Sequence, residues 1–273
     1  MLELPEAITL ARQIEETLRG RRCVSAVADH SPHKFAWYYG DPAEYGRRLS
    51  GRQVLGAEAH GGMVEIVLDG VRLVFGDGAL LRYVAAGKKR PTKHQLLVEL
   101  DDGAAVFVRL QMYGGIWCFP EGEFDNPYYE VACRKPAPLS GEFDESYFTS
   151  LLDDRCRTKS AKAFLATEQR IPGLGNGVLQ DILWNARISP RRKMDTLTDA
   201  ELAVLFKSVK STLQEMVKLG GRDTEKDFFG QPGGYITRMS KNTWRLPCPV
   251  CGGEIKKEAY LGGSVYHCPG CQK

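Results

Sequence analysis

Four cysteines near the end of the chain are the residues whose spacing most clearly indicates chemistry. Cys248 and Cys251 form one Cys-x-x-Cys pair, and Cys268 and Cys271 form a second. Two such pairs on the arms of a hairpin supply the four thiolate ligands of a tetrahedral zinc site. Four thiolates leave no open position for a reacting water, so we expect one structural Zn²⁺. Metal binding would then supply most of the folding free energy of the short segment between the pairs.

Two disulfide bonds are the alternative for these cysteines. Each Cys-x-x-Cys pair would close a strained bridge, and the other four cysteines of the chain are scattered without pairing spacing: Cys23, Cys118, Cys133 and Cys156. The pattern therefore favours zinc and a reducing compartment.

A glycine-rich sequence in the second half of the chain is a candidate anion site. Gly173, Gly175 and Asn176 stand just before a predicted helix at about 177–187. Glycines let the backbone approach a ligand, amide groups at a helix N-terminus attract phosphate, and an asparagine adds a side-chain donor. Taken alone, such a sequence is more often a tight turn.

The elements that must position these residues change along the chain. Pro5, with Glu3 and Glu6 near the positive end, opens a helix to about Leu18. Residues 23–119 contain short period-two runs separated by Asp-Gly pairs, which predict an antiparallel sheet. After Ser140 the pattern becomes helical, with short helices at 146–152, 160–170 and 177–187. A capping box at Thr198 opens a longer helix, and residues 222–247 form a long glycine-containing loop.

Composition limits the class of protein but does not reveal its partner. The 273 residues carry 37 Lys and Arg against 34 Asp and Glu, a formal net charge of +3, which does not by itself favour nucleic acid. The chain starts without the basic flank of a signal peptide, and it lacks an apolar run of membrane-spanning length. We therefore expect a cytoplasmic monomer without a membrane partner.

Several motifs in the same order resemble one family across nearly the whole chain. They are Glu-Leu-Pro-Glu at residues 3–6, Gln169-Arg-Ile-Pro-Gly-Leu-Gly-Asn176, Ile182-Leu-Trp184, Ile188-Ser-Pro190 and Cys268-Pro-Gly-Cys-Gln272. This chain resembles the formamidopyrimidine-DNA glycosylase and endonuclease VIII family. The resemblance implies an α+β fold that grips damaged or abasic double-stranded DNA and flips the lesion out of the helix.

The resemblance also implies a division of the chain. An antiparallel β-sandwich domain with one N-terminal helix would occupy residues 1–119, followed by a linker at 120–139. A helix-two-turn-helix domain would occupy 140–246, and a four-cysteine zinc-finger β-hairpin would occupy 247–273.

The N-terminal residues depart from the family pattern at the reacting group. In formamidopyrimidine-type members a proline follows the initiator methionine and, once exposed, its secondary amine attacks the sugar and forms a Schiff base. Here Leu2 occupies that position. Methionine is normally removed only before small residues, so we expect Met1 to stay and the Leu2 nitrogen to be an amide. The Met1 amine would lie up to about 3.6 Å away, while Glu3, which assists sugar opening in the family, and Glu6 are retained.

The resemblance assigns further DNA-contacting positions, several of which are altered. Met63 aligns with a hairpin lysine and Gly263 with an arginine that grips the lesion phosphate, so both changes remove a cation. The intercalating wedge appears as Gln111, Met112 and Tyr113, of which Tyr113 would still stack into the vacated space. Gly173, Gly175 and Asn176 keep the family pattern and would contact DNA phosphate.

Three hypotheses follow from these matches and departures. The first is a base-excision glycosylase with weak or absent lyase activity. The second is a catalytically inactive protein that recognises a DNA lesion or structure. The third is a zinc protein that contacts RNA or another protein. The first is favoured by the family, and the second by the combined changes at Leu2, Met63 and Gly263.

Overall fold

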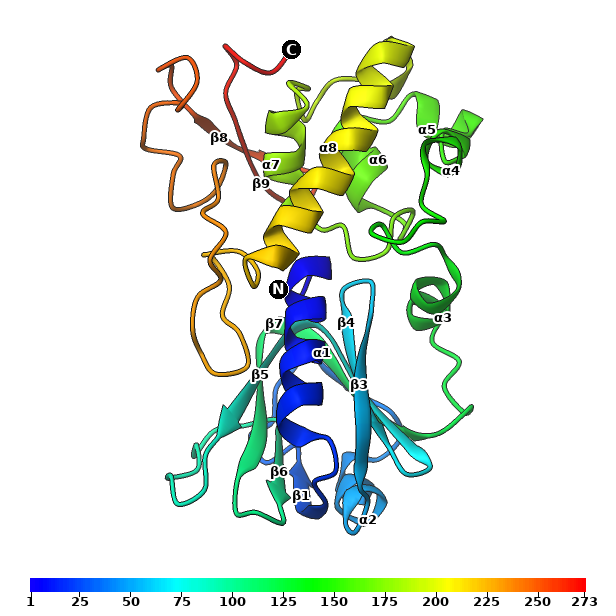
Figure 1. The fold of residues 1–273 in the computed structure, drawn as a ribbon, viewed down its shortest axis with the longest axis vertical. Helices are drawn as coiled ribbons and strands as arrows, with labels where there is room; N and C mark the ends of the chain where they lie inside the picture. The colour runs from blue at the N-terminus through cyan, green and yellow to red at the C-terminus, as the bar shows by residue number, and fades with distance from the viewer. The chain divides into compact units, whose positions relative to one another are not determined.

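A computed structural model describes residues 1–273, which divide into two compact units. Unit 1 comprises residues 1–130 and 225–232, and unit 2 comprises residues 131–224 and 233–273. Helix α3 (Pro127–Arg134) spans the boundary in the chain (Figure 1). The division into four parts that the resemblance implies stays a prediction.

Unit 1 opens with helix α1 (Leu4–Leu18), which covers the sheet through a single apolar face. Leu4, Leu10 and Ile14 are all at most 2% exposed, as their helical spacing predicts. Pro5 lies in the first turn, where its missing N–H costs no hydrogen bond. The helix ends before Gly20, whose φ of 84° permits the turn into the sheet.

One sheet forms most of unit 1, in the order β1-β6-β7-β5-β4-β3. Its strands are β1 (Cys23–Ala28), β3 (Val54–His60), β4 (Met63–Leu68), β5 (Val71–Val84), β6 (Leu96–Leu100) and β7 (Ala105–Pro120). All these neighbours are antiparallel, whereas the short β2 (Ala36–Tyr38) joins β7 in parallel. A register shift between Asp77 and Ala79 interrupts the long β5–β7 pairing. Strands that continue through such a bulge bend the sheet into two layers.

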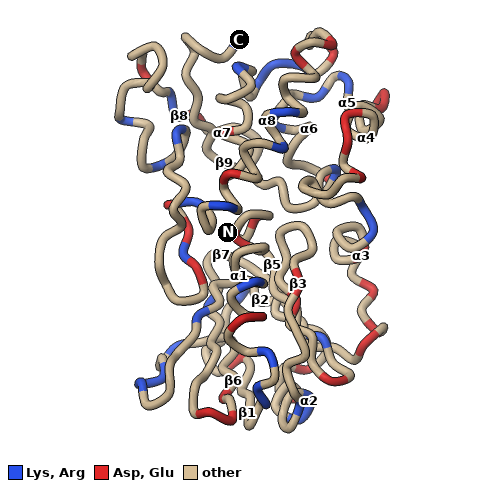
Figure 2. The backbone as a smooth tube through the Cα atoms, in the orientation of Figure 1, with Lys and Arg blue, Asp and Glu red and all other residues tan.

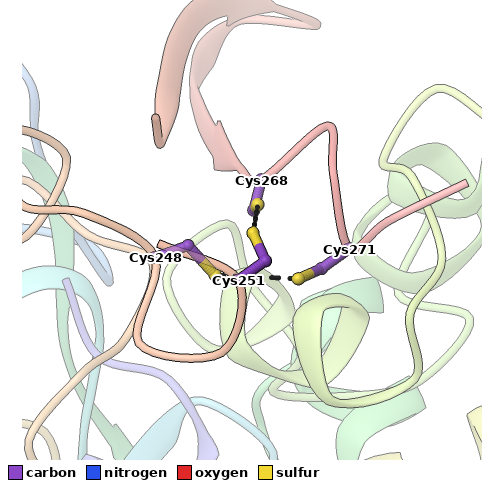
Figure 3. A group of neighbouring side chains, drawn as sticks. All are labelled: Cys248, Cys251, Cys268 and Cys271. Atoms are coloured by element: carbon purple, nitrogen blue, oxygen red, sulfur yellow. Dashed lines mark hydrogen bonds between the residues drawn. The ribbon is translucent and has the colours of Figure 1, made fainter. Parts of the chain in front are cut away.

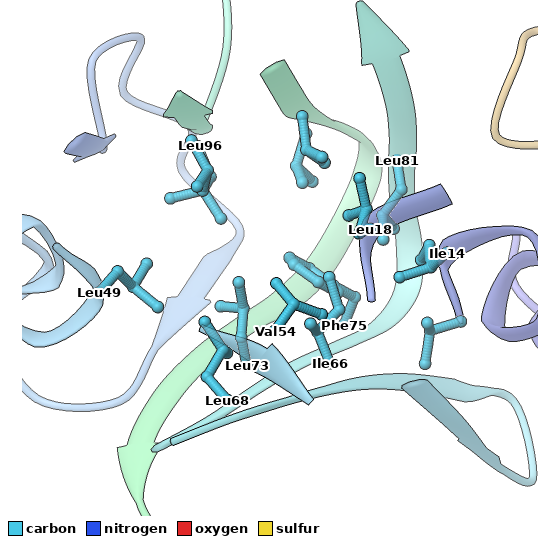
Figure 4. Packing of buried hydrophobic residues seen from close by; sticks show 14 of the residues in the cluster. Ile14, Leu18, Leu49, Val54, Ile66, Leu68, Leu73, Phe75, Leu81 and Leu96 are labelled. Atoms are coloured by element: carbon cyan, nitrogen blue, oxygen red, sulfur yellow. The ribbon is translucent and has the colours of Figure 1, made fainter. Parts of the chain in front are cut away.

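The core of unit 1 fills the space between these layers and α1. Figure 4 shows leucine, isoleucine, valine and phenylalanine side chains converging from the strands and the helix. Phe75 and Val64 are fully buried at its centre. The 3-10 turn η1 (Pro42–Glu44) and helix α2 (Tyr45–Leu49) close the edge near β1.

Residues 225–232 belong to unit 1 although unit 2 surrounds them in the sequence. The Gln13 side chain donates to the Asp227 carboxylate at 2.9 Å and accepts from the Phe228 amide at 3.0 Å. The Tyr83 amide donates to the Phe228 carbonyl at 2.9 Å. Phe228 itself is fully buried in the core. These contacts fix a segment in which the sequence indicated only a loop.

Unit 2 is helical, with a small terminal hairpin. Its elements are α4 (Glu145–Ser150), α5 (Asp154–Arg157), α6 (Ala161–Ala166), α7 (Val178–Asn185), η2 (Met194–Thr196), α8 (Asp199–Lys218), β8 (Lys256–Tyr260) and β9 (Gly263–His267). The capping box predicted at Thr198 is present at the start of α8. Asp181 of α7 orders the long segment after α8, because its carboxylate accepts the amides of Arg238 and Met239 at 2.9 and 2.7 Å.

The predicted fold class is confirmed: helices combine with an antiparallel sheet and a terminal β-hairpin that carries four cysteines. Several element bounds differ from the prediction. β5 and β7 are longer than the short runs that the sequence predicts, because they cross the glycine-containing bend. Helix α6 ends at Ala166, before Glu168 and Gln169, which have positive φ values.

Charged residues of both signs are interspersed along each unit (Figure 2). No helix combines the length and the apolarity that a membrane crossing requires.

Candidate functional site

The first two residues lie against the bend in β5. The Leu2 amide donates to the Asp77 carbonyl at 2.6 Å, and the Leu2 side chain packs against the core of unit 1. The Met1 ammonium forms an ion pair with Glu225 Oε1 at 3.0 Å. The nitrogens of Met1 and Leu2 therefore both have defined partners within unit 1.

Acidic groups surround this N-terminal ammonium. Asp77 has a φ of 57°, which places its backbone in the left-handed region at the bulge. Burial raises the pKa of the Asp77 carboxyl, while the charge of the N-terminal ammonium opposes this shift. Burial lowers the pKa of the nearby Arg82 guanidinium, and the charges of Asp227 and Glu225 oppose that shift. The Met1 ammonium thus belongs to a network of charges on β5 and the 225–232 segment.

Glu3 and Glu6 lie at the start of α1, as predicted. Glu3 is the N-cap residue, Glu6 is in the first turn, and they are 6% and 5% exposed. A carboxylate at a helix N-terminus interacts favourably with the helix dipole. Their roles in proton transfer stay predictions.

Met63 lies inside unit 1. The side chain is 7% exposed and packs with Val74, Trp117 and Phe119 in a separate hydrophobic cluster. This packing gives Met63 a structural role, and its predicted role in DNA binding stays a prediction. An ammonium here would have to leave the cluster or remain buried, which is unfavourable without a charged partner.

Gln111, Met112 and Tyr113 form an exposed loop within β7, opposite the β5 bulge. The loop folds closely over Gly78, where a Cβ atom would lie 2.0 Å from the Gln111 carbonyl oxygen. Met112 has a φ of 70° and is 66% exposed. Tyr113 is half-buried and contacts Trp37 of β2, with ring centroids 5.6 Å apart. Sequence reasoning missed Trp37.

Within unit 2 the structure brings Asn176 and Gly263 together. The Asn176 side-chain amide donates to the Ser264 carbonyl at 2.9 Å, and Gln180 Nε2 donates to the same oxygen at 3.0 Å. A Cβ atom at Gly263 would lie 3.2 Å from Asn176 Nδ2, so a larger residue would press on Asn176. Asn176 Oδ1 is buried without a hydrogen-bond partner.

The two other predicted glycines belong to the turn that leads to Asn176. Gly173 has a φ of 83°, a conformation that favours glycine, and Gly175 accepts the Leu179 amide at the start of α7. The turn at residues 173–176 therefore contacts the β8–β9 hairpin through Asn176, and we call this contact the Asn176 joint.

The four predicted zinc ligands converge at the base of that hairpin (Figure 3). Their sulfur atoms all lie within 4.8 Å of one another, and two Sγ–Sγ distances, Cys248–Cys271 and Cys251–Cys268, are 3.7 and 3.4 Å. Thiolates bound 2.3 Å from one zinc ion lie about 3.8 Å apart. All eight cysteines of the chain are free, so the disulfide alternative is not realised.

Two family models match residues in both units. Residues 1–150 match the model of the formamidopyrimidine-DNA glycosylase N-terminal domain, and residues 135–227 match that of the formamidopyrimidine-DNA glycosylase H2TH domain. The chain belongs to the formamidopyrimidine-DNA glycosylase family. The resemblance inferred from the motifs is thereby confirmed.

Individual relatives match over their full length. A formamidopyrimidine-DNA glycosylase of Rhodopseudomonas palustris is 31% identical, with 100% of both chains covered. One from Pelotomaculum thermopropionicum is 30% identical, covering 100% of this chain and 99% of the relative. The crystal structure of the MutM (Fpg) protein from Thermus thermophilus superposes with a TM-score of 0.81 at 25% identity, covering 99% of this chain and 98% of that one.

The fold is also that of Lactococcus lactis Fpg, crystallised with DNA that contains an abasic site. The TM-score is 0.83 at 24% identity, with 99% of each chain covered. Within this family fold, unit 1 carries the N-terminal residues, Met63 and the Gln111–Tyr113 loop. Unit 2 carries the Asn176 turn, Gly263 and the four cysteines.

Proposed function

We propose that this protein binds damaged or abasic duplex DNA and releases a damaged base, with weak or absent strand-cleaving lyase activity. Family membership supports the DNA substrate. The retained Asn176 turn and the exposed Tyr113 loop support a phosphate contact and an intercalating wedge.

The observation that carries the proposal is the state of the two N-terminal nitrogens. The Leu2 nitrogen is an amide whose N–H is donated to the Asp77 carbonyl, and an amide lone pair is delocalised into its carbonyl. The Met1 nitrogen lies one residue earlier in the chain and is engaged in an ion pair with Glu225 Oε1 at 3.0 Å. Neither nitrogen is ready to attack C1′ of a nucleotide.

Base release by water does not need either amine. Water would add to C1′ as the C1′–N bond breaks, its proton would pass to a carboxylate, and the departing base would take up a proton. Glu3 is our candidate for the proton transfer. The products would be the free base and an abasic site, and no Schiff base would form.

We further propose that Cys248, Cys251, Cys268 and Cys271 hold one structural Zn²⁺. The convergence of four thiols within 4.8 Å supports this ligand set, which would stabilise the hairpin rather than take part in the reaction. Free thiols throughout the chain are compatible with work in the cytoplasm.

A catalytically inactive lesion-binding protein is the second candidate. Met63 is packed in a hydrophobic cluster, and Gly263 lies against Asn176. The family pattern would place a cation at each of these two positions near the reacting sugar. Neither Met63 nor Gly263 supplies one.

The decisive experiment mixes the purified protein with duplexes that carry an abasic site, a damaged base or no lesion, with and without borohydride. We expect preferential binding of the lesion duplexes, weaker binding by Asn176→Ala to all duplexes alike, and little trapped adduct. Base release that Glu3→Gln abolishes without loss of binding would support the glycosylase, and absence of release would favour the inactive binder. Efficient trapping mapped to the N-terminal amine would refute the proposed defect.

A further inference from the structure

Two aromatic residues that the proposed function does not use lie on the surface of unit 1. Phe35 is 49% exposed and Trp37 is 46% exposed. Phe35 lies in a turn that leads directly into β2, and Trp37 is the middle residue of that strand. Large aromatic rings this exposed are candidates for contact with a partner.

The backbone places Trp37 beside the loop of β7. β2 pairs in parallel with β7, with Ala36 opposite Gly114 and Trp37 opposite Gly115. The Gly114 amide also donates to the Phe35 carbonyl at 3.1 Å. This pairing holds the Trp37 and Tyr113 rings with centroids 5.6 Å apart and planes inclined by 43°.

That inclination decides what the two rings can bind. Rings inclined by 43° cannot both lie flat against the same face of one planar base. They offer two separate stacking surfaces, as aromatic residues do when they contact successive bases of an unpaired strand. Tyr113 is the proposed wedge, so Trp37 is left for a second base.

Charge beside the rings favours a nucleic acid over an apolar protein surface. Lys34 is exposed, and its Nζ lies 5.3 Å from the centroid of the Phe35 ring. A cation next to exposed aromatic rings suits a base with its adjoining phosphate. Met112 of the 111–113 loop is also exposed and has a φ of 70°, so it adds an apolar side chain to this surface.

We propose that Trp37 stacks on the unpaired nucleobase left opposite the lesion, while Tyr113 fills the gap and Lys34 lies near the adjoining phosphate. This inference rests on the proposed function, because an unpaired base arises only when its partner is missing or flipped out. It assigns to β2 a contact with the DNA strand opposite the lesion.

The test compares two duplexes that differ only opposite a stable tetrahydrofuran abasic site. One carries a normal base there, and the other carries a second tetrahydrofuran. We expect Trp37→Ala to lower affinity for the first duplex about tenfold and to leave affinity for the second nearly unchanged, while Trp37→Phe retains most of the binding. Tyr128→Ala removes another aromatic ring of unit 1, 58% exposed, and serves as the matched control.

A second measurement reports stacking directly. 2-Aminopurine placed opposite the abasic site should lose fluorescence on binding the native protein, and much less on binding Trp37→Ala. Equal loss of affinity for both duplexes, no loss for either, or unchanged quenching would overturn the inference while leaving lesion binding intact. Self-association abolished by Trp37→Ala, without an effect on DNA, would assign the surface to a second copy of the chain and also overturn it. Failure of the native protein to prefer any lesion duplex would instead refute the proposed function.

Discussion

Replacing Leu2 by proline tests whether a missing amine is what limits Schiff-base chemistry. Proline is small enough to permit removal of Met1, so the Leu2→Pro protein should begin with a secondary amine at position 2. The nitrogen of Leu2 already lies 2.6 Å from the Asp77 carbonyl oxygen. A neutral secondary amine still has one N–H group, so it can keep this hydrogen bond and be held in the same place while its lone pair stays free to attack.

The structure sets the expected cost in stability and the expected gain in rate. Leu2 is only partly buried against the core, so its replacement should cost about 1–2 kcal/mol. Loss of the Met1–Glu225 ion pair, whose side chains are 38% and 23% exposed, should cost at most about 1 kcal/mol. A domain stable by roughly 5–15 kcal/mol tolerates both losses. Because a misplacement of about 1 Å can cost a hundredfold, we expect trapping to rise by at least about a hundredfold.

The assay is borohydride trapping on an abasic duplex, with the N-terminus of each protein determined by mass spectrometry. Leu2→Ala is the matched control, because it should also lose Met1 and expose a primary amine at the same position. Leu2→Ile should keep Met1 and trap no better than the native protein. If Leu2→Pro has lost Met1 and binds the duplex normally, yet traps no faster, then the missing amine does not explain the defect.

Two other predictions concern the zinc ligands and a buried carboxylate. Cys251→Ser should abolish zinc binding, expose the β8–β9 amides to hydrogen exchange and weaken DNA binding through the Asn176 joint; a native protein without zinc would contradict this. Glu65 is 4% exposed and accepts hydrogen bonds from His60 at 3.0 Å and Tyr129 at 2.6 Å, with Arg72 Nε also at 3.0 Å. Burial alone would raise the pKa of Glu65, but the bonds from His60 and Tyr129 outweigh it and hold the pKa below its usual value. The ionised Glu65 carboxylate therefore stabilises the fold above its unfolded pKa of about 4.3, and this contribution is lost as pH falls through the lower folded pKa. The unfolding temperatures of the native protein and of Glu65→Gln should differ at neutral pH and converge below about pH 4. A difference that stays constant with pH would refute the assignment.

Local spacing was sufficient to predict some features and insufficient for others. The cysteine pairs and the capping box at Thr198 are patterns within a few residues, and the structure contains both arrangements. The long strands were cut short because glycines at 76, 78, 114 and 115 resemble strand breaks. In the structure these glycines accompany the bend where β5 and β7 continue.

Two site features depend on contacts that the sequence does not display. The family resemblance assigns Met63 to the position of a hairpin lysine, but it cannot reveal that the side chain packs with Trp117 and Phe119. Trp37 lies in a strand of three residues whose parallel partner is far along the chain. Two aromatic residues within three positions, Phe35 and Trp37, are the local signal for that surface.

The discontinuity of unit 1 has a consequence for the order of events during synthesis. The ribosome releases the sheet and α1 long before residues 225–232, which supply buried Phe228 and the Glu225 carboxylate. Until then the core of unit 1 lacks one of its side chains, and the Met1 ammonium lacks its ion-pair partner. Enzymes that process nascent N-termini therefore act on Met1 before Glu225 has been synthesised. The ion pair cannot protect Met1 at that stage, so residue 2 alone determines whether this methionine is kept.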